Sequence, residues 1–358
     1  MKIVSVVGAR PQFIKATCLS RALRSFCEEV LIHTGQHYDQ NMSDVFFKQL
    51  QLPVPDYNLG VGSGTHGEQT AKMMEGIEPI LIKEKPDLVL VYGDTNSTLA
   101  GSLTAAKMQI PIAHVEAGLR SYNRAMPEEI NRVVTDHLSN LLFCPTSQAV
   151  KNLQCEGFRD HIHLVGDIMY DSVLFYKDES LKQSIILKTL KLIPKKYCLA
   201  TIHRQENTNH PKKLKSILEA FQQLGRMVVL PLHPRTKKCI QQWNLEDLLL
   251  APNILVIPPC SYLDSLRLVN DAEFILTDSG GLQKEAYILE VPCITLRDET
   301  EWVETVETGW NHVVGSNTDR ILEMIDRLVI PETSPAVFGD GHSADHICRI
   351  IQTYLQVK

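Results

Sequence analysis

Residues 89–129 read VLVYGDTNSTLAGSLTAAKMQIPIAHVEAGLRSYNRAMPEE, and this stretch decides the fold of the chain. Two apolar runs, 88–92 and 110–115, each end next to a carboxylate, Asp94 in the first case and Glu116 in the second. A further acidic pair, Glu128 and Glu129, follows Pro127. Ligands of an open parallel sheet bind outside the carboxyl ends of its strands. The pattern therefore predicts several carboxylates at one cleft, an arrangement that favours acid/base chemistry on an uncharged part of a substrate.

Short apolar runs alternate with amphipathic stretches along the whole chain. This alternation is typical of βαβ units and of a doubly wound parallel sheet. We expect strands at 3–7, 29–33, 88–92, 110–115, 141–144 and 162–165, and again at 197–202, 227–232, 254–257, 273–277 and 293–296. Helical patterns lie at 14–26, 68–85, 97–108 and 128–139. The predicted fold class is α/β, with two doubly wound Rossmann-like domains facing a central cleft.

The domain boundary is expected near residue 170. Alternation pauses over a polar, lysine-rich stretch at about 177–196, and then restarts. A last helical pattern, 342–355, places Ile347, Ile350, Ile351 and Leu355 on one face, which could return to the first domain. We predict an N-terminal domain of residues 1–170 plus the helix 342–358, and a C-terminal domain of residues 171–341.

The composition is that of an ordinary globular protein. The 358 residues are 44% hydrophobic and 22% charged, with a formal net charge of −6. This charge gives no reason to expect a nucleic acid or an anionic membrane as a partner. The nine cysteines form no C-x-x-C pair, and we found neither a signal-peptide pattern nor an apolar run long enough to span a membrane. We therefore expect a cytoplasmic protein.

The turn after the first strand is a candidate anion site. It reads GARPQFIK, residues 8–15, and opens a helical pattern. Backbone N–H groups at such a helix start attract anions, and Arg10 and Lys15 add two cations. The turn has neither the Walker A pattern nor G-x-G-x-x-G.

One G-x-G-x-x-G does occur, at 62–67, but we interpret it as a flexible loop. No predicted strand precedes it, and a dinucleotide-binding fingerprint needs a strand before it and a helix after it. The sequence therefore gives no NAD site.

The second domain has its own candidate phosphate turn, TDSGGLQKE at 277–285. Gly280 and Gly281 at the start of a helix allow backbone N–H groups to approach a phosphate closely. Ser279 offers a hydroxyl, and Glu285 could hold ribose hydroxyls. The alternative is an ordinary capping turn with Ser279 or Asp278 as the N-cap. Anion sites on both domains favour a diphosphate, as in a nucleotide sugar.

Two histidines follow strands of the second domain. His203 precedes Arg204, and His233 begins the sequence HPR. A histidine at the carboxyl end of a strand is well placed as a proton donor or a phosphate partner. His342 and His346 have the spacing of a metal pair but lack a supporting carboxylate motif, so we predict no metal site.

These motifs together resemble one family, the non-hydrolysing UDP-N-acetylglucosamine 2-epimerases, over nearly the whole chain. The matching motifs are GARP at 8–11, TGQH at 34–37, GDT at 93–95, HVEAGLR at 114–120, PEEINR at 127–132, His203-Arg204, and DSGG at 278–281.

The resemblance implies a GT-B-like fold and a homodimer. It also implies inversion at C2 of a UDP-linked 2-acetamido sugar, for surface polysaccharide precursors, with neither NAD nor a metal as cofactor. UDP is eliminated to give a glycal, and is added back after C2 has been protonated on the opposite face. By resemblance Asp94, Glu116, Glu128 and His203 are catalytic. The substrate-binding residues are then Arg10, Lys15, Arg124, His233, Ser279, Gly280, Gly281 and Glu285.

The chain departs from the family pattern at several positions, among them residues 65–69, where THGEQ lacks the arginine of members regulated by their own substrate. Many members that act on plain UDP-N-acetylglucosamine read TERPE where this chain has Trp302 in TEWVE, and Lys284 replaces a common glutamate. The Trp302 form, with Arg124 before Pro127, resembles the branch that acts on UDP-2,3-diacetamido-2,3-dideoxy-glucuronic acid. Arg124 could pair with the C6 carboxylate of that sugar. A hydrolysing 2-epimerase and a GT-B glycosyltransferase are the further alternatives.

Overall fold

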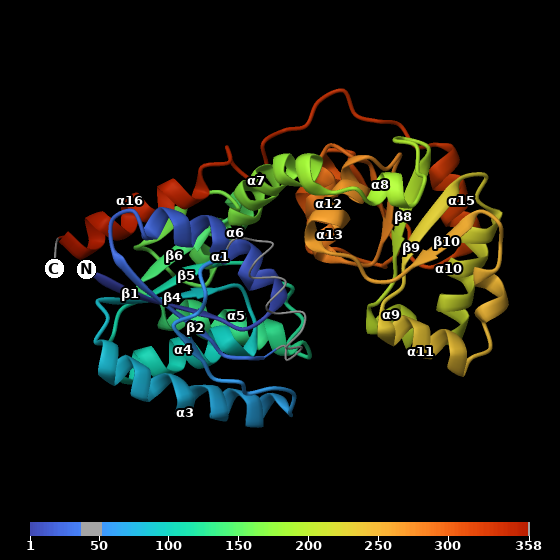
Figure 1. Ribbon diagram of the computed structural model, residues 1–358. Coiled ribbons are helices and arrows are strands. Elements are labelled where there is room, and N and C mark those ends of the chain that lie inside the picture. Colours follow the sequence, from blue (N-terminus) through green and yellow to red (C-terminus); the bar gives the residue numbers. More distant parts are fainter. Residues whose placement is uncertain (37–51, 357–358) are drawn as a thin grey trace. The chain divides into compact units, whose positions relative to one another are not determined.

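Two parallel β-sheets organise the chain (Figure 1). The computed structural model describes residues 1–36 and 52–356, apart from the side chain of Arg10. Contacts divide the chain into unit 1, which comprises Met1–Ser172 and Ala336–Lys358, and unit 2, Val173–Pro335. The predicted fold class is confirmed in that each unit is built on its own parallel sheet with helices along it.

Unit 1 contains a seven-stranded sheet of order β3-β2-β1-β4-β5-β6-β7. Every strand pair found among the described residues is parallel, as strands joined by crossover helices must be. The strands are β1 (Lys2–Val7), β2 (Glu28–His33), β3 (Tyr57–Asn58), β4 (Leu88–Tyr92), β5 (Ile112–Val115), β6 (Leu141–Cys144) and β7 (Ile162–Leu164).

Helices cover the sheet of unit 1 because their apolar stripes meet its buried strands. Met73 and Ile77 of α3 pack with Val89 and Val91 of β4 in one core. The last helix, α16, packs in this unit, where the N–H of Ala344 donates to Asp171 Oδ2 at 2.8 Å. The helices are α1 (Arg10–Leu23), α3 (His66–Glu84), α4 (Asn96–Lys107), α5 (Pro127–Leu138), α6 (Ser147–Cys155) and α16 (Ser343–Gln356).

Unit 2 repeats this topology with a six-stranded sheet of order β10-β9-β8-β11-β12-β13. The strands are β8 (Tyr197–Thr201), β9 (Met227–Pro231), β10 (Ile254–Ile257), β11 (Ile275–Thr277), β12 (Cys293–Thr295) and β13 (Asn311–Val313). The helices are α8 (Ile186–Thr189), α9 (Gln205–Thr208), α10 (Pro211–Gln223), α11 (Pro234–Gln242), α12 (Tyr262–Asn270), α13 (Gly280–Ile288), α14 (Val303–Glu307) and α15 (Thr318–Asp326), with a 3₁₀ turn at Glu246–Leu249.

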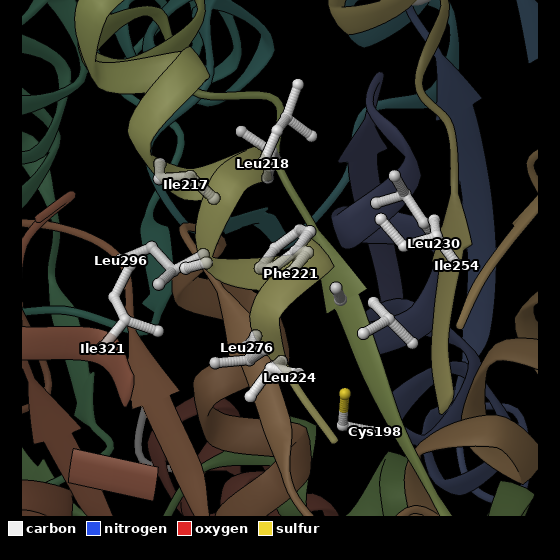
Figure 2. Close-up of a cluster of buried hydrophobic side chains, with 14 of the residues drawn as sticks. Cys198, Ile217, Leu218, Phe221, Leu224, Leu230, Ile254, Leu276, Leu296 and Ile321 are labelled. Atoms are coloured by element: carbon white, nitrogen blue, oxygen red, sulfur yellow. The ribbon is translucent and has the colours of Figure 1, made fainter. Parts of the chain in front are cut away.

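The core of unit 2 lies between α10 and the sheet (Figure 2). Phe221 of α10 is fully buried, together with Leu230 of β9 and Leu276 of β11. Burial of side chains of this size contributes about 1.5–3 kcal/mol each. This packing fixes the sheet edge on which the functional turns of unit 2 stand.

The structure differs from the predicted elements at several points. Helix α1 begins at Arg10 instead of residue 14, because Pro11 in its first turn suits a helix start. Helix α7 (Ile168–Gln183) extends into the lysine-rich stretch and crosses the boundary between the units. The short strands β3 and β13 were not predicted. Residues 62–65 form a loop, as predicted, but strand β3 lies four residues before Gly62 and α3 begins at His66, so the statement that no strand precedes this loop was wrong.

Candidate active site

The two turns that flank the switch point of the unit 1 sheet hold the first group of candidate residues. Strands β1 and β4 are neighbours, and the strand order runs outward from them in both directions. Such a switch point is where doubly wound sheets bind ligands. Gly8 follows β1, Asp94 follows β4, and Glu116 follows the adjacent strand β5. The structure therefore places Asp94 and Glu116 at the predicted edge.

Asp94 is held in place by helix α5. Arg132 donates to Asp94 Oδ2 from Nε at 3.0 Å and from Nη2 at 2.7 Å. Asn131 Nδ2 donates to the backbone carbonyl of Asp94 at 2.9 Å. The side chain of Asp94 is nevertheless 31% exposed. It is a fixed carboxylate that a ligand can still reach.

Glu116 forms an ion pair with Lys15 of α1, and both side chains are almost buried. The Glu116 carboxylate lies against Gly93, since a Cβ built on Gly93 would come within 3.1 Å of Glu116 Oε2. Glu116 thus lies next to the turn that presents Asp94. Lys15, which the sequence analysis assigned to the substrate, instead contacts a candidate catalytic carboxylate.

The turn after β1 is already satisfied from within the protein. The N–H groups of Gly8 and Ala9 donate to Gln12 Oε1 at 2.8 and 3.0 Å. Gln12 Nε2 in turn donates to the carbonyl of Tyr92 at 2.8 Å. These two backbone N–H groups therefore point to Gln12. The prediction was that they point to a bound anion. Arg10 begins α1, and its side chain lies outside the description.

The two glutamates at the start of α5 have different surroundings. Glu129 is buried and accepts hydrogen bonds from the N–H groups of Ser121 and Tyr122, both at 2.9 Å, and from Arg132 Nη1 at 2.8 Å. Burial raises the pKa of Glu129, but the hydrogen bonds from Ser121 and Arg132 outweigh it and lower that pKa. Glu129 thus holds a loop in place. Glu128 is exposed and forms no ion pair within the described part of the chain.

Arg124 lies on another side of α5. It lines a cavity of about 450 Å³ together with Tyr122, Ile130, His137 and neighbouring residues of that helix. Glu128 is not among the residues that line this cavity. Arg124 is exposed and forms no ion pair with any residue in ranges 1–36 and 52–356.

A buried hydrogen-bonded chain behind these turns was missed by the sequence analysis. His114 and Asp136 are both fully buried, and His114 Nδ1 lies 2.7 Å from Asp136 Oδ1. His114 Nε2 lies 2.8 Å from the carbonyl oxygen of Gly93. Asp136 Oδ2 accepts from the N–H of Gly118 at 3.1 Å and pairs with Arg120 Nη1 at 2.7 Å. His114 and Arg120 belong to the quoted HVEAGLR motif, while Asp136 lies four residues beyond the PEEINR motif.

The switch point of unit 2, between β8 and β11, is organised around one carboxylate. Asp278 is fully buried directly after β11. Its oxygens accept from the N–H groups of His203, at 3.0 and 3.1 Å, and of Arg204, at 3.1 Å. Asn207 Nδ2 donates to it as well, at 3.1 Å. Asp278 therefore ties the turn after β8 to the turn after β11.

His203 and His233 lie together at this edge, with ring centroids 5.7 Å apart. Burial lowers the pKa of His203, against the opposing charge of Asp278. Burial and Arg235 also lower the pKa of His233. The N–H of Arg235 donates to His233 Nδ1 at 3.1 Å, so the neutral ring keeps its proton on Nε2. The pair provides two uncharged imidazoles at neutral pH.

Helix α13 begins with the predicted serine and glycines. Ser279 caps it, with Oγ accepting from the N–H of Leu282 at 3.4 Å, as the alternative interpretation proposed. A Cβ on Gly280 would lie 2.2 Å from Glu301 Oε1, whereas one on Gly281 would meet only Ser279 Oγ at 3.9 Å. Glu285 lies one turn into α13 and is buried.

Two of the departures from the family pattern, Lys284 and Trp302, contact each other. Lys284 Nζ lies 4.2 Å from the ring centroid of Trp302, a distance typical of a cation–π contact. Both residues are buried.

Comparison with known proteins identifies the family. The family model described as UDP-N-acetylglucosamine 2-epimerase matches residues 21–352. The chain belongs to this family. A protein named UDP-N-acetylglucosamine 2-epimerase homolog from Methanococcus maripaludis is 53% identical, covering 98% of the chain and 99% of its own length. The UDP-2,3-diacetamido-2,3-dideoxy-D-glucuronate 2-epimerase of Pseudomonas aeruginosa is 49% identical over the same shares.

Solved structures of this family match the whole fold. The Methanocaldococcus jannaschii UDP-GlcNAc 2-epimerase, in complex with UDP-GlcNAc and UDP, has a TM-score of 0.90 at 45% identity, covering 99% of this chain and 100% of that one. The predicted family, GT-B-like fold and enzyme class are thereby confirmed. Within residues 1–36 and 52–356, no helix has both the length and the apolar character needed to cross a membrane.

Proposed function

We propose that this 2-epimerase family member inverts C2 of a UDP-2-acetamido sugar without hydrolysis, interconverting UDP-N-acetylglucosamine and UDP-N-acetylmannosamine for surface polysaccharide precursors. The observation that supports it most is the family match over residues 21–352, combined with Asp94 after β4 at the switch point of unit 1 and Glu116 against the adjoining Gly93. Catalytic groups of doubly wound folds stand at this place.

The chemistry explains why several carboxylates are needed. The C2 proton is next to no carbonyl, so a carboxylate cannot remove it from the intact sugar. When the C1–oxygen bond breaks, its electron pair leaves with UDP and C1 becomes oxocarbenium-like, which makes the C2 proton acidic. A carboxylate then takes that proton and a C1=C2 double bond forms. Protonation of C2 on the opposite face and return of the UDP oxygen to C1 complete the inversion.

We assign the proton transfers to Asp94, Glu116 and Glu128. Asp94 and Glu116 are each paired with a cation, Arg132 and Lys15 respectively, which holds the carboxylates in fixed positions. Glu128 is exposed at the start of α5, without such a partner in the described structure. His203 is a catalytic or phosphate-side partner.

Unit 2 is proposed to bind UDP. His203, His233 and the N-terminus of α13, with Ser279, Gly280 and Gly281, provide donors for the diphosphate. Glu285 is proposed for the ribose hydroxyls, and Arg10 and Lys15 for the departing diphosphate. The Lys15 ammonium has three N–H donors, so it can bind a phosphate oxygen while it is paired with Glu116.

UDP-2,3-diacetamido-2,3-dideoxy-glucuronic acid is the second candidate substrate. Arg124 is an exposed cation with no ionic partner among the described residues, and a relative named for this sugar is 49% identical. A C6 carboxylate is a ligand that an arginine binds well.

Incubation with each UDP-sugar in deuterated water tests the reaction. We expect deuterium at C2 of a sugar that is still attached to UDP. NMR and mass spectrometry detect this product. Release of free sugar would indicate a hydrolysing enzyme. Absence of exchange with both sugars would leave a glycosyltransferase as the better candidate.

Comparison of kcat/KM for the two UDP-sugars identifies the preferred substrate. The proteins compared are the wild type, Arg124→Ala and the control Arg159→Ala, whose arginine is also exposed. If the uronic acid is the substrate, Arg124→Ala lowers its kcat/KM by about 10-fold or more, and Arg159→Ala does not. Equal loss on the uncharged sugar contradicts the carboxylate role.

We also propose that the enzyme is a cytoplasmic homodimer, in line with the family resemblance. Its nine free cysteines fit a reducing compartment. Light scattering on the purified full chain measures the oligomeric state, and a monomer would contradict the proposal.

A further inference from the structure

We propose that His114 and Asp136 are positioning residues that hold the Asp94 turn and the Glu116 turn in one fixed relation. The inference rests on the proposed function, because it gives these two carboxylates their catalytic role. Neither His114 nor Asp136 is exposed, so both act through the backbone of the two turns and not on the substrate.

The first turn is held on both sides of its Gly93 peptide group. The N–H of Gly93 donates to the carbonyl of Val115 at 2.9 Å, and its carbonyl lies 2.8 Å from His114 Nε2. Gly93 has a φ of +61°, and Asp94 is the next residue. The imidazole of His114 therefore sets the direction in which the chain leaves β4, and with it the position of the Asp94 carboxylate.

The second turn is held by the other oxygen of the same carboxylate. Asp136 Oδ2 accepts from the N–H of Gly118 at 3.1 Å, directly after Glu116 and Ala117. Glu116 has a φ of +75°, a conformation that costs a non-glycine residue about 1–3 kcal/mol and persists only where surrounding contacts enforce it. Gly118 is also left-handed, and a Cβ there would lie 2.4 Å from the carbonyl of Ala149.

Both ring nitrogens of His114 are used in hydrogen bonds. The carbonyl of Gly93 can only accept, so Nε2 donates. Burial raises the pKa of Asp136, but His114 and Arg120 outweigh it and lower that pKa. Arg120 pairs with Glu156 through Nε at 2.6 Å, which balances the buried charges. The nearby Cys144 thiol stays neutral, because burial raises its pKa to about 12.

Helix α5 is the element that joins these contacts. Arg132, which holds the Asp94 carboxylate, and Asp136, which holds both turns, are four residues apart and share one face of the helix. Asp94 is thereby fixed from its side chain and from its backbone by a single helix.

Removal of either group tests the inference. We expect His114→Ala and Asp136→Ala to lower kcat about 100-fold, because a shift of about 1 Å in a catalytic group has an effect of this size. KM for the UDP-sugar and Kd for UDP should change less than about 3-fold, since the lost interaction is one of transition-state geometry. Asp136→Asn keeps an acceptor for Gly118 and a donor for Nδ1 of a neutral His114, so we expect it to recover kcat to within about 10-fold of wild type.

Glu29→Gln is the matched control for loss of a buried carboxylate. Glu29 is also buried in unit 1, and it accepts from Ser5 Oγ at 2.7 Å and from Arg24 Nε at 2.9 Å, away from the active-site turns. We expect it to lower the melting temperature without lowering kcat. Wild-type kcat in folded His114→Ala and Asp136→Ala would overturn the inference, as would an equal loss of kcat in Glu29→Gln.

An NMR measurement keeps the inference testable if the alanine variants fail to fold or the proposed reaction is wrong. In the ¹⁵N-histidine-labelled wild-type protein we expect an Nε2–H signal from the ring of His114, assigned by its loss in His114→Gln. Absence of this Nε2–H signal would overturn the inference. Absence of C2 exchange in wild type, with the Nε2–H signal present, would refute the proposed function but not the hydrogen bond from His114 to Gly93.

Discussion

The carboxyl edges of the two sheets have the same topology but opposite charge arrangements. In unit 1, each candidate carboxylate is paired with a cation: Asp94 with Arg132, and Glu116 with Lys15. In unit 2, a single carboxylate, Asp278, accepts from backbone N–H groups and leaves two neutral histidines at the edge. One edge presents carboxylates paired with cations, and the other presents histidines beside a buried carboxylate.

This difference agrees with the separate roles proposed for the two units, proton transfer in unit 1 and UDP binding in unit 2. Proton transfer at carbon needs carboxylates in fixed positions, and the ion pairs with Arg132 and Lys15 hold them there. An anionic leaving group is bound by hydrogen-bond donors that carry no negative charge, such as the free N–H groups at the start of a helix. The same switch point can thus serve either half of an elimination, depending on which residues follow the strands.

The largest effect is expected at the carboxylates of unit 1. Asp94→Asn and Glu116→Gln should each lower kcat by about 10³-fold, the range for loss of general acid/base catalysis, with Kd for UDP within about tenfold of wild type. C2 deuterium exchange and calorimetry with UDP measure the two quantities.

Asp87→Asn is the matched control, because Asp87 lies at the opposite end of strand β4 and accepts from the N–H of Lys2 at 2.8 Å. It should leave kcat unchanged. If Asp94→Asn instead weakens UDP binding and spares kcat, the division between the two edges is wrong.

The next effect separates the two roles of Lys15. Lys15→Met leaves the nearly buried Glu116 without its cation, which we expect to cost about 3–5 kcal/mol of unfolding free energy, while Lys15→Met/Glu116→Gln recovers most of it. Calorimetric unfolding of both variants measures this. A Lys15 that mainly binds diphosphate would instead show little loss of stability and a large loss of UDP affinity.

Much of the fold could be predicted because its signal is local. Buried parallel strands are continuous apolar runs, and β4 and β6 were predicted with their observed bounds. Strands β3 and β13 were missed, since Tyr57–Asn58 and Asn311–Val313 are short and contain polar residues. They are recognised as strands only through pairing with β2 and β12.

The site was predictable only in part. Asp94, Glu116 and His203 could be placed at strand ends, since that follows from topology alone. The pairing of Lys15 with Glu116 joins residues about a hundred positions apart, and no local pattern encodes such a contact. Asp136 was missed for the same reason: its four-residue spacing from Arg132 shows a shared helix face, but not which turns that face meets.

A smaller effect distinguishes the two glycines that begin α13. Gly280→Ala would force Glu301 away from Arg297, which donates to it at 2.8 Å, so we expect a loss of about 1–3 kcal/mol in the stability of unit 2. Gly281→Ala has open space and should stay within about 0.5 kcal/mol of wild type. Tryptophan fluorescence in urea measures both, because Trp243, Trp302 and Trp310 all lie in unit 2. Equal stability of the two variants would contradict the close packing of Glu301 against Gly280.

The smallest effect is the contribution of His203 to the pH dependence of stability. The folded-state pKa of His203 lies below the ordinary value of 6.5. Between these two pKa values the unfolded chain binds more protons than the folded one, so stability is retained above pH 6.5 and lost on acidification below it. The ring is 37% exposed, so solvent screening limits the contribution of His203 to less than about 1 kcal/mol.

The variant His203→Gln isolates that contribution. Its loss of stability between pH 7.5 and pH 5.5, followed by tryptophan fluorescence, should be smaller than that of wild type, whereas the exposed His210→Gln in the same unit should behave as wild type. A larger loss in His203→Gln would mean that the folded protein prefers the charged imidazole. The edge of unit 2 would then hold a charged His203 beside Asp278. Both edges would contain carboxylates paired with cations, and they would differ only in which partner is buried.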